Sequence, residues 1–412
     1  MTKLLNGKLS FVKYELPVMI LLFGQAIYNL IPFDGVGNLL QLYYLIDYSM
    51  SKTSRLFVGS LVRLINENPS KEWINGFALT VLTITLILVS LLVGGVIRNT
   101  DKELRPTLYV FIAFLVTGSF AMENFSKFLG VLDIWMFLAA LLAVICAYNK
   151  HLRWLVPVIC AVGGFIHNGF AITYFPLVIL IVFYLMVTSE KKVANAIIFA
   201  LSSAVAVILT IWVSVEGFKT TTVTQNELIE ILKKRCGDNY NSGAAEYISF
   251  YLLDIVPEHA SFGSEAIENT TIIERFFLMS SYALNKNPSN AYIVASVVMT
   301  LTIFPAFWAI WIKCMKNTDD KSRRFVYFCF LAFTFFVPLG FFLIEDYVRW
   351  IQAGMLTQLG VVFFMYFIKD EPFMKTMQQA KSFFADKAYI IIFVLIAYAS
   401  SYQFAPSAAM NS

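Results

Sequence analysis

Long apolar runs alternate with short polar segments along almost the whole chain. Each run has about 20 residues, the length that an α-helix needs to cross the hydrocarbon core of a bilayer. We therefore expect an all-α fold, a polytopic transmembrane bundle of about eleven spans that forms one integral membrane domain over residues 1–412. The predicted spans are 15–33, 76–97, 106–122, 132–149, 154–167, 170–188, 193–214, 291–313, 325–344, 350–368 and 388–404.

One apolar stretch, 154–188, is too long for a single span. A continuous helix of that length would overshoot the bilayer even when tilted. The stretch is interrupted at His167-Asn168-Gly169. The break predicts two shorter spans joined by a tight hairpin.

Composition supports the membrane class and narrows the partners. Of the 412 residues 58% are hydrophobic and only 14% are charged, whereas a soluble domain has roughly 25% charged residues. We expect contact with membrane lipids and none with nucleic acid. The five cysteines form no CxxC or Cys/His spacing, so neither a metal site nor a disulfide framework is expected.

Basic residues orient the bundle. With the N-terminus in the cytoplasm, 19 of the 31 Lys and Arg residues fall in cytoplasmic segments and 18 of the 27 acidic residues fall outside. Short cytoplasmic loops carry such an excess of Lys and Arg. The first apolar run follows three lysines and lacks a small-residue cleavage site, which indicates a retained anchor. We expect a multi-pass cell-membrane protein with its C-terminus outside.

Two outer loops and one cytoplasmic segment have amphipathic patterns. The first outer loop, 34–75, contains a run from Leu56 to Ile65 that places Ser60 and Arg63 on one helical face, typical of a helix lying flat in the membrane interface. The large outer loop, 215–290, predicts interfacial helices near 226–235 and 272–284. The cytoplasmic stretch from Lys369 to Lys387 predicts a basic surface helix.

The unusual polar residues gather in the outer connections. Ionisable groups at or below a membrane surface are costly and tend to be paired or functional. Four separate connections bring them to the same leaflet, which predicts a shared site. They are Asp47, Tyr48, Lys52 and Arg55, then Glu123, then His167 and Asn168, and finally Asp346 and Arg349.

These residue types suit transfer to a hydroxyl acceptor. An aspartate within hydrogen-bond reach accepts the acceptor's proton, so Asp47 is the candidate general base, with His167 and Asp346 as further catalytic candidates. Arginine binds phosphate bidentately and stabilises charge on a leaving phosphate. We assign that role to three residues and support to three more. The phosphate-binding candidates are Arg55, Arg349 and Lys52, and the supporting residues are Glu123, Asn168 and Tyr48. No cofactor or metal is expected, since no DxD pair lies near Asp47 and no Gly-rich phosphate loop occurs.

Each assignment has a structural alternative. Asp47 and Arg55 could form a salt bridge that holds the loop, and His167 could cap a turn. The segment with Asp346 and Arg349 could be an aromatic-belt anchor. The remaining acids and bases have equally plain interpretations. Glu123 could be structural, Asp133 could be a favourable charge at a helix start, and Lys233-Lys234-Arg235 could be a solvated face.

The arrangement resembles two groups of membrane proteins. An acidic residue after the first span, a flat helix beside it and a large outer loop after the seventh span resemble the GT-C class of polyprenyl-phosphate-sugar-dependent glycosyltransferases. The spacing of Asp47 and Arg55, the His167 hairpin and the connection carrying Asp346 and Arg349 resemble bacterial cell-surface glycan proteins of the EpsG/Wzy repeat-unit polymerase kind. The resemblance implies a polyprenyl-linked sugar donor, a glycan acceptor and Asp47 as base. A second acidic residue, usual in the GT-C loop, is not evident.

A flippase or transporter of lipid-linked sugars is the rival from another class. Transporters of that kind show inverted repeats and charges at the bilayer midplane. Here the mid-span positions are nearly free of charge, which favours the enzyme. An acyltransferase with His167 as base is a further alternative.

Overall fold

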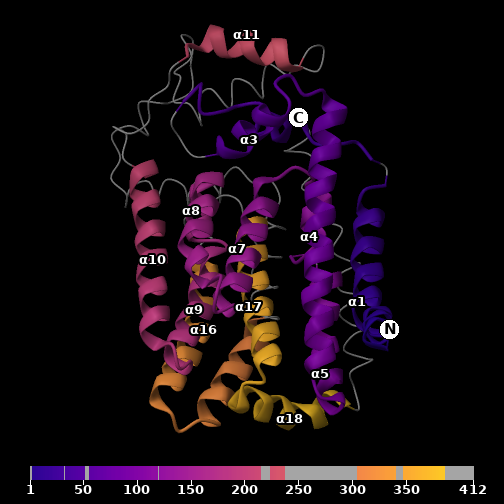
Figure 1. Ribbon diagram of the computed structural model, residues 1–412, viewed down its shortest axis with the longest axis vertical. Helices are drawn as coiled ribbons and strands as arrows, with labels where there is room; N and C mark the ends of the chain where they lie inside the picture. The colour runs from indigo at the N-terminus through magenta and orange to yellow at the C-terminus, as the bar shows by residue number, and fades with distance from the viewer. Residues whose placement is uncertain are drawn as a thin grey trace.

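The computed structural model describes residues 2–31, 33–51, 55–118, 120–214, 223–236, 304–339 and 347–385 (Figure 1). Within these ranges the chain is helical with short connections and has no β-strand. The longer helices are α1 (Thr2–Asn29), α3 (Phe57–Ile65), α4 (Lys71–Asn99), α5 (Arg105–Thr117), α7 (Leu132–Tyr148), α8 (Val156–Ile166), α9 (Phe175–Thr188), α10 (Lys192–Ser214), α11 (Gln225–Cys236), α16 (Lys321–Leu339), α17 (Tyr347–Ile368) and α18 (Glu371–Ala385). Residues 304–316 are also helical. The short elements are α2 (Asn38–Leu42), α6 (Glu123–Lys127), η1 (Lys102–Leu104), η2 (Arg153–Leu155) and η3 (Asn168–Ala171).

The all-α prediction is therefore confirmed. Among the described residues, five helices are long and apolar enough to cross a membrane, namely Ser10–Asn29, Lys71–Asn99, Asn168–Thr188, Lys192–Trp212 and Arg349–Ile368. Two shorter apolar helices, Leu132–Tyr148 and Arg153–Ile166, pack among them. The predicted span 388–404 and the first part of 291–313 lie outside the described residues.

Helix starts follow local chemistry. Proline occupies the first turn of α5, α8 and α9, as Pro106, Pro157 and Pro176. Its fixed φ suits that turn, and its missing N–H has no helical partner there in any case. At the start of α4 the hydroxyl of Ser70 instead accepts a hydrogen bond from the backbone N–H of Trp73, at 3.3 Å.

The chain reverses at His167. Arg153, before the start of α8, donates to Asn195 Oδ1 at 3.0 Å, and Asn195 Nδ2 donates to the carbonyl of Leu185 near the end of α9, also at 3.0 Å. The beginning of α8 and the end of α9 therefore lie at the same end of the bundle. The hairpin predicted from the His167-Asn168-Gly169 break is confirmed.

Helix α18 crosses the lower end of the bundle in Figure 1 and is anchored by Asp370. Tyr184 Oη donates to Asp370 Oδ2 at 2.6 Å, Tyr327 Oη donates to Oδ1, and the backbone N–H of Phe373 donates to Oδ1 at 3.1 Å. Asp370 thus caps α18 and ties it to α9 and α16. The helix predicted between Lys369 and Lys387 is confirmed.

The opposite end is covered by a cap. We use this name for residues 33–51, 55–66 and 223–236, which include α3 and α11. In Figure 1 both helices lie above the upper ends of α7 and α8, while α4, with 29 residues, rises past those ends. The candidate site lies on this side of the bundle, away from α18.

Candidate functional site

Helix α3 sits directly on the backbone of residues 43–46, and Gly59 makes this possible. A Cβ at position 59 would lie 1.7 Å from the carbonyl oxygen of Ile46 and 3.2 Å from that of Tyr43. No side chain fits at that distance, so a glycine is required for the approach. The contact fixes the position of Asp47, the next residue along the chain.

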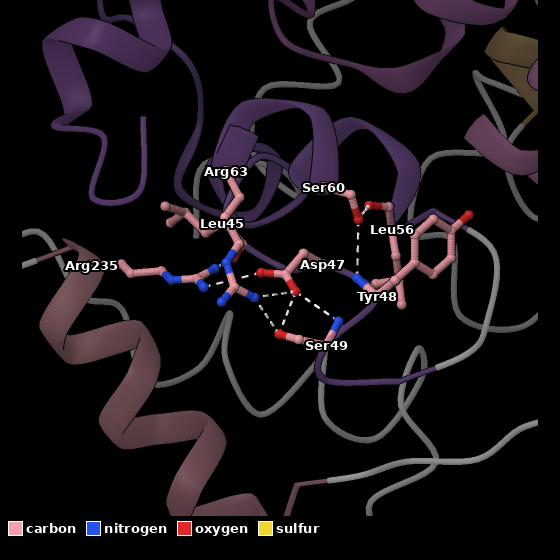
Figure 2. A network of polar contacts seen from close by, with 8 residues as sticks. All are labelled: Leu45, Asp47, Tyr48, Ser49, Leu56, Ser60, Arg63 and Arg235. Atoms are coloured by element: carbon pink, nitrogen blue, oxygen red, sulfur yellow. Dashed lines mark hydrogen bonds and ion pairs between the residues drawn. The ribbon is translucent and has the colours of Figure 1, made fainter. Parts of the chain in front are cut away.

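The carboxylate of Asp47 is buried and collects donors from three segments (Figure 2). Its Oδ1 accepts from the backbone N–H of Ser49 at 2.7 Å, from the Ser49 hydroxyl at 2.5 Å and from Arg63 Nη1 at 3.0 Å. Its Oδ2 accepts from Arg235 Nη2 at 3.0 Å, and Arg235 also donates to the carbonyl of Leu45. Asp47 thereby links the first loop, α3 and α11.

The helical face predicted for Ser60 and Arg63 is confirmed, and both side chains contact the segment 47–49. Ser60 Oγ accepts from the backbone N–H of Tyr48 at 3.0 Å and donates to the carbonyl of Leu56 at 2.8 Å. One turn later Arg63 reaches Asp47 and Ser49, because residues three apart share a helix face. The two side chains hold the segment 47–49 against α3.

The pKa of Asp47 lies below its ordinary value. Burial raises the pKa, but the hydrogen bonds from Ser49 and the charge and hydrogen bond of Arg235 together outweigh it. The carboxyl is therefore ionised at neutral pH and binds a proton weakly. Beside it, burial raises the pKa of Tyr48 to about 12, and the Tyr48 hydroxyl has no hydrogen-bond partner among the described residues.

His167 occupies the break between α8 and η3. Its backbone is extended, with φ −161° and ψ 132°, and its Nδ1 accepts from the backbone N–H of Gly169 at 2.7 Å. The same N–H also lies 3.0 Å from Asn168 Oδ1. With the Nδ1 lone pair engaged, a neutral imidazole carries its proton on Nε2. His167 thus both caps the turn and presents a hydrogen-bond donor.

Two arginines act on His167. Burial lowers the pKa of His167 well below its ordinary value, and the positive charges of Arg55 and Arg349 lower it further. Arg349, at the start of α17, forms an ion pair with Asp133, which is buried in the first turn of α7. The ends of α7, α8 and α17 that bear Asp133, His167 and Arg349 therefore carry a connected polar cluster.

Arg55 has a strained backbone, with φ +73°. A non-glycine residue in the left-handed region costs of order 1–3 kcal/mol and persists only where its surroundings enforce it. Such residues concentrate at functional sites. The strain sets Arg55 apart from the neighbouring arginines of the cap.

The structure brings together only part of the predicted site. Asp47 pairs with Arg63 and Arg235, so the alternative of an Asp47–Arg55 salt bridge is wrong. Glu123 forms an ion pair with Lys127 at 2.5 Å within α6, in agreement with its structural interpretation. Lys52 and Asp346 lie outside the described residues, as does the predicted helix 272–284, whereas the helix predicted at 226–235 is α11.

Three participants were not predicted as such. Arg235 was expected on a solvated face with Lys233 and Lys234, yet its side chain is only 9% exposed while both lysines are exposed. Asp133 was expected to be a charge at a helix start, which it is, but its partner is Arg349. The three-residue spacing of Ser60 and Arg63 could have predicted that Arg63 contacts the same segment as Ser60. The pairing of Arg235 with Asp47 has no local signal at all.

The described residues contain no group of three or more His, Cys, Asp or Glu that could hold a metal ion. The fold and site define an all-helical protein with apolar helices suited to a membrane and a buried polar cluster beneath a cap. No family model, curated protein or solved structure matches the chain.

Proposed function

We propose that the protein is an integral-membrane glycosyltransferase or repeat-unit polymerase. It transfers sugar from a polyprenyl-(pyro)phosphate-linked donor to a glycan acceptor on the outer face of the cytoplasmic membrane. In this proposal the bundle has about eleven spans, the N-terminus is cytoplasmic, and α3 and α11 lie at the outer interface. Leu64 and Ile65 of α3 support the last point, since they are 85% and 60% exposed on an otherwise docked helix.

The observation that carries the proposal is the action of Arg55 and Arg349 on the buried His167. Arg349 forms an ion pair with Asp133, and the charges of Arg349 and Arg55 both act on the imidazole, which is neutral. The described part of the cluster therefore combines two guanidinium groups with a buried hydrogen-bond donor. Such a site favours an anion, and arginine suits the planar, bidentate recognition of phosphate.

Within this proposal each residue has a distinct task. Arg55 and Arg349 bind the phosphate of the donor and stabilise the charge that develops as it leaves. His167 donates from Nε2 to a phosphate or sugar oxygen, a role that its Nδ1–Gly169 bond and lowered pKa favour over that of a base. No metal or cofactor takes part.

Asp47 is better suited to positioning than to proton transfer. A general base works best when its pKa lies near the working pH, and the pKa of Asp47 is lowered instead. Its Oδ1 already accepts from three donors. In the proposal, Asp47 holds α3 and α11 in place above the cluster. Its role as a general base, which the sequence predicted, stays a prediction.

Reconstituted protein tests the proposal. Purified protein in liposomes is given a polyprenyl-pyrophosphate-linked oligosaccharide, and extension of the glycan is followed by gel and mass spectrometry. We expect Arg55→Ala to reduce extension by about 10² to 10³-fold, the range seen when one stabilising donor is lost. The matched control is Lys381→Ala, whose exposed ion pair with Glu103 lies at the α18 end of the bundle, and it should extend at the wild-type rate.

Two histidine variants sharpen the test. His167→Asn keeps an acceptor for the Gly169 N–H, because its Oδ1 replaces Nδ1, but it lacks the Nε2 donor. His167→Gln carries a donor at the place of Nε2. We expect extension to fall in His167→Asn and to recover in part in His167→Gln. Movement of the lipid-linked sugar across the bilayer without any extension would replace the transferase with the rival flippase.

A further inference from the structure

A second feature lies at the other end of the bundle, between the spanning helices. A groove with a cavity volume of about 340 Å³ runs between α4, α7 and α17, with α9 behind it. Its walls are apolar, and examples are Val93, Leu141, Val144, Leu356 and Phe363. A volume of this size is within the range of ligand-binding pockets, roughly 300–1,000 Å³.

The groove has a direction. Its wall on α7 runs from Phe137 to Tyr148 and its wall on α17 from Leu356 to Phe367, and both runs finish at the end of the bundle where α18 lies. Eleven residues of helix rise about 17 Å. Each leaflet contributes about 15 Å to the thickness of the hydrocarbon core. The length of the groove along the helices therefore matches the length of one lipid chain in a single leaflet.

The mouth of the groove carries a cation. Arg98, in the last turn of α4, is the charged residue in its lining, and its side chain is 55% exposed. Its Nη1 forms an ion pair with Glu15 Oε1 at 2.9 Å and lies 3.4 Å from Ser10 Oγ. No partner within the described ranges binds its Nη2 or Nε. A guanidinium has five N–H donors, so donors remain for a second anion.

We propose that this groove binds a membrane lipid with an anionic phosphate head group, from the leaflet on the α18 side. One chain of the lipid fills the apolar groove, and its phosphate accepts from Arg98. The apolar walls favour a hydrocarbon chain, and the length of the groove restricts that chain to one leaflet. The charge of Arg98 favours an anionic head group over a zwitterionic one. The inference depends on the bundle crossing a membrane and is independent of the proposed transferase activity at the opposite end.

Native mass spectrometry of the full-length protein in detergent provides the test. Delipidated protein is titrated with phosphatidylglycerol and, separately, with phosphatidylcholine of the same chain length. We expect wild type to prefer phosphatidylglycerol by roughly fivefold, the contribution of about one basic residue near an anionic head group. Equal affinity for the two lipids would overturn the proposal.

Charge variants assign the preference to Arg98. Replacing Arg98 alone would leave the buried Glu15 unpaired, so the informative change is Arg98→Gln together with Glu15→Gln. This double variant should bind both lipids equally. Glu15→Gln alone frees Arg98 and should keep or strengthen the preference. A preference that persists in the double variant would show that the head group lies elsewhere.

A shape variant assigns the chain to the groove. Val144 lines the groove and is half-buried, so Val144→Trp should fill the groove and weaken both lipids. The matched control is Ile84→Trp, because Ile84 is 49% exposed on α4 and does not line the groove. If the control weakens binding as much as Val144→Trp, or if Val144→Trp binds both lipids as wild type does, the groove is not a lipid site.

Discussion

Arg235 donates to the carboxylate of Asp47 at 3.0 Å, although the two residues are 188 positions apart in the chain. Both side chains are buried, with 9% and 3% of their surfaces exposed. The pair fastens α11 to the first loop and so closes the cap over the polar cluster. Because it is buried, the pair is more sensitive to the loss of one partner than a surface ion pair would be.

The first prediction concerns this pair. Asp47→Asn leaves the Arg235 guanidinium buried without a counter-charge, and we expect a loss of about 3 kcal/mol in the stability of the cap. Arg235→Gln should cause a similar loss. Thermal unfolding in detergent measures the loss, and trypsin cleavage at Lys233 and Lys234 reports release of α11.

Arg63→Gln is the control for this comparison. Arg63 contacts the same carboxylate, but its side chain is 40% exposed, so water replaces part of the interaction and the loss should be at most about 1 kcal/mol. Equal effects of Arg63→Gln and Arg235→Gln would contradict the assignment of Arg235 as the main fastening.

The second prediction compares two glycines. Gly59→Ala places a methyl group against the Ile46 carbonyl, which belongs to the backbone and cannot rotate away, so we expect a loss of at least about 2 kcal/mol. Gly76→Ala, within α4, meets no atom within 4 Å and should stabilise the protein by about 0.5–1 kcal/mol. If both variants shift the melting temperature in the same direction, Gly59 does not lie as close to the Ile46 carbonyl as the structure places it.

The third prediction separates strain from charge at Arg55. Both Arg55→Gly and Arg55→Ala remove the guanidinium, but only glycine adopts φ +73° without penalty. The glycine variant should therefore be more stable than the alanine variant by about 1 kcal/mol. Glycan extension should be equally reduced in both. If extension survives in the glycine variant alone, backbone geometry at position 55 matters more than its charge.

The fourth prediction concerns pH. The folded-state pKa of His167 lies well below its ordinary value of 6.5, so between these two values the unfolded chain binds a proton that the folded chain does not. Stability should fall as the pH is lowered through about 6.5, by at most about 1.4 kcal/mol per pH unit. Melting curves from about pH 7.5 to about pH 5 measure the slope. His167→Asn keeps the turn and should flatten it, and an unchanged slope would assign the effect to another group.

Local patterns predicted the helices well because each is encoded within its own segment. The apolar run 76–97 became α4, the break at His167 became a hairpin, and the three-residue spacing of Ser60 and Arg63 put both on the face that holds segment 47–49. Pairings across the chain could not be predicted in this way. Arg235 and Asp47 meet because α11 folds back over the first loop, and Arg349 meets Asp133 because the start of α17 lies near the start of α7.

The short first arm of the His167 hairpin affects the lipid around it. This arm, Arg153–Ile166, has 14 residues, which correspond to about 21 Å, whereas the second arm, Asn168–Thr188, has 21 residues and is long enough to cross. The hydrocarbon core of a bilayer is about 30 Å thick. An arm too short for this thickness is accommodated by local thinning of the bilayer, at a cost of fractions of a kcal/mol per ångström. A bilayer around the protein should therefore be thinner beside α8, which brings lipid head groups closer to the polar cluster at His167.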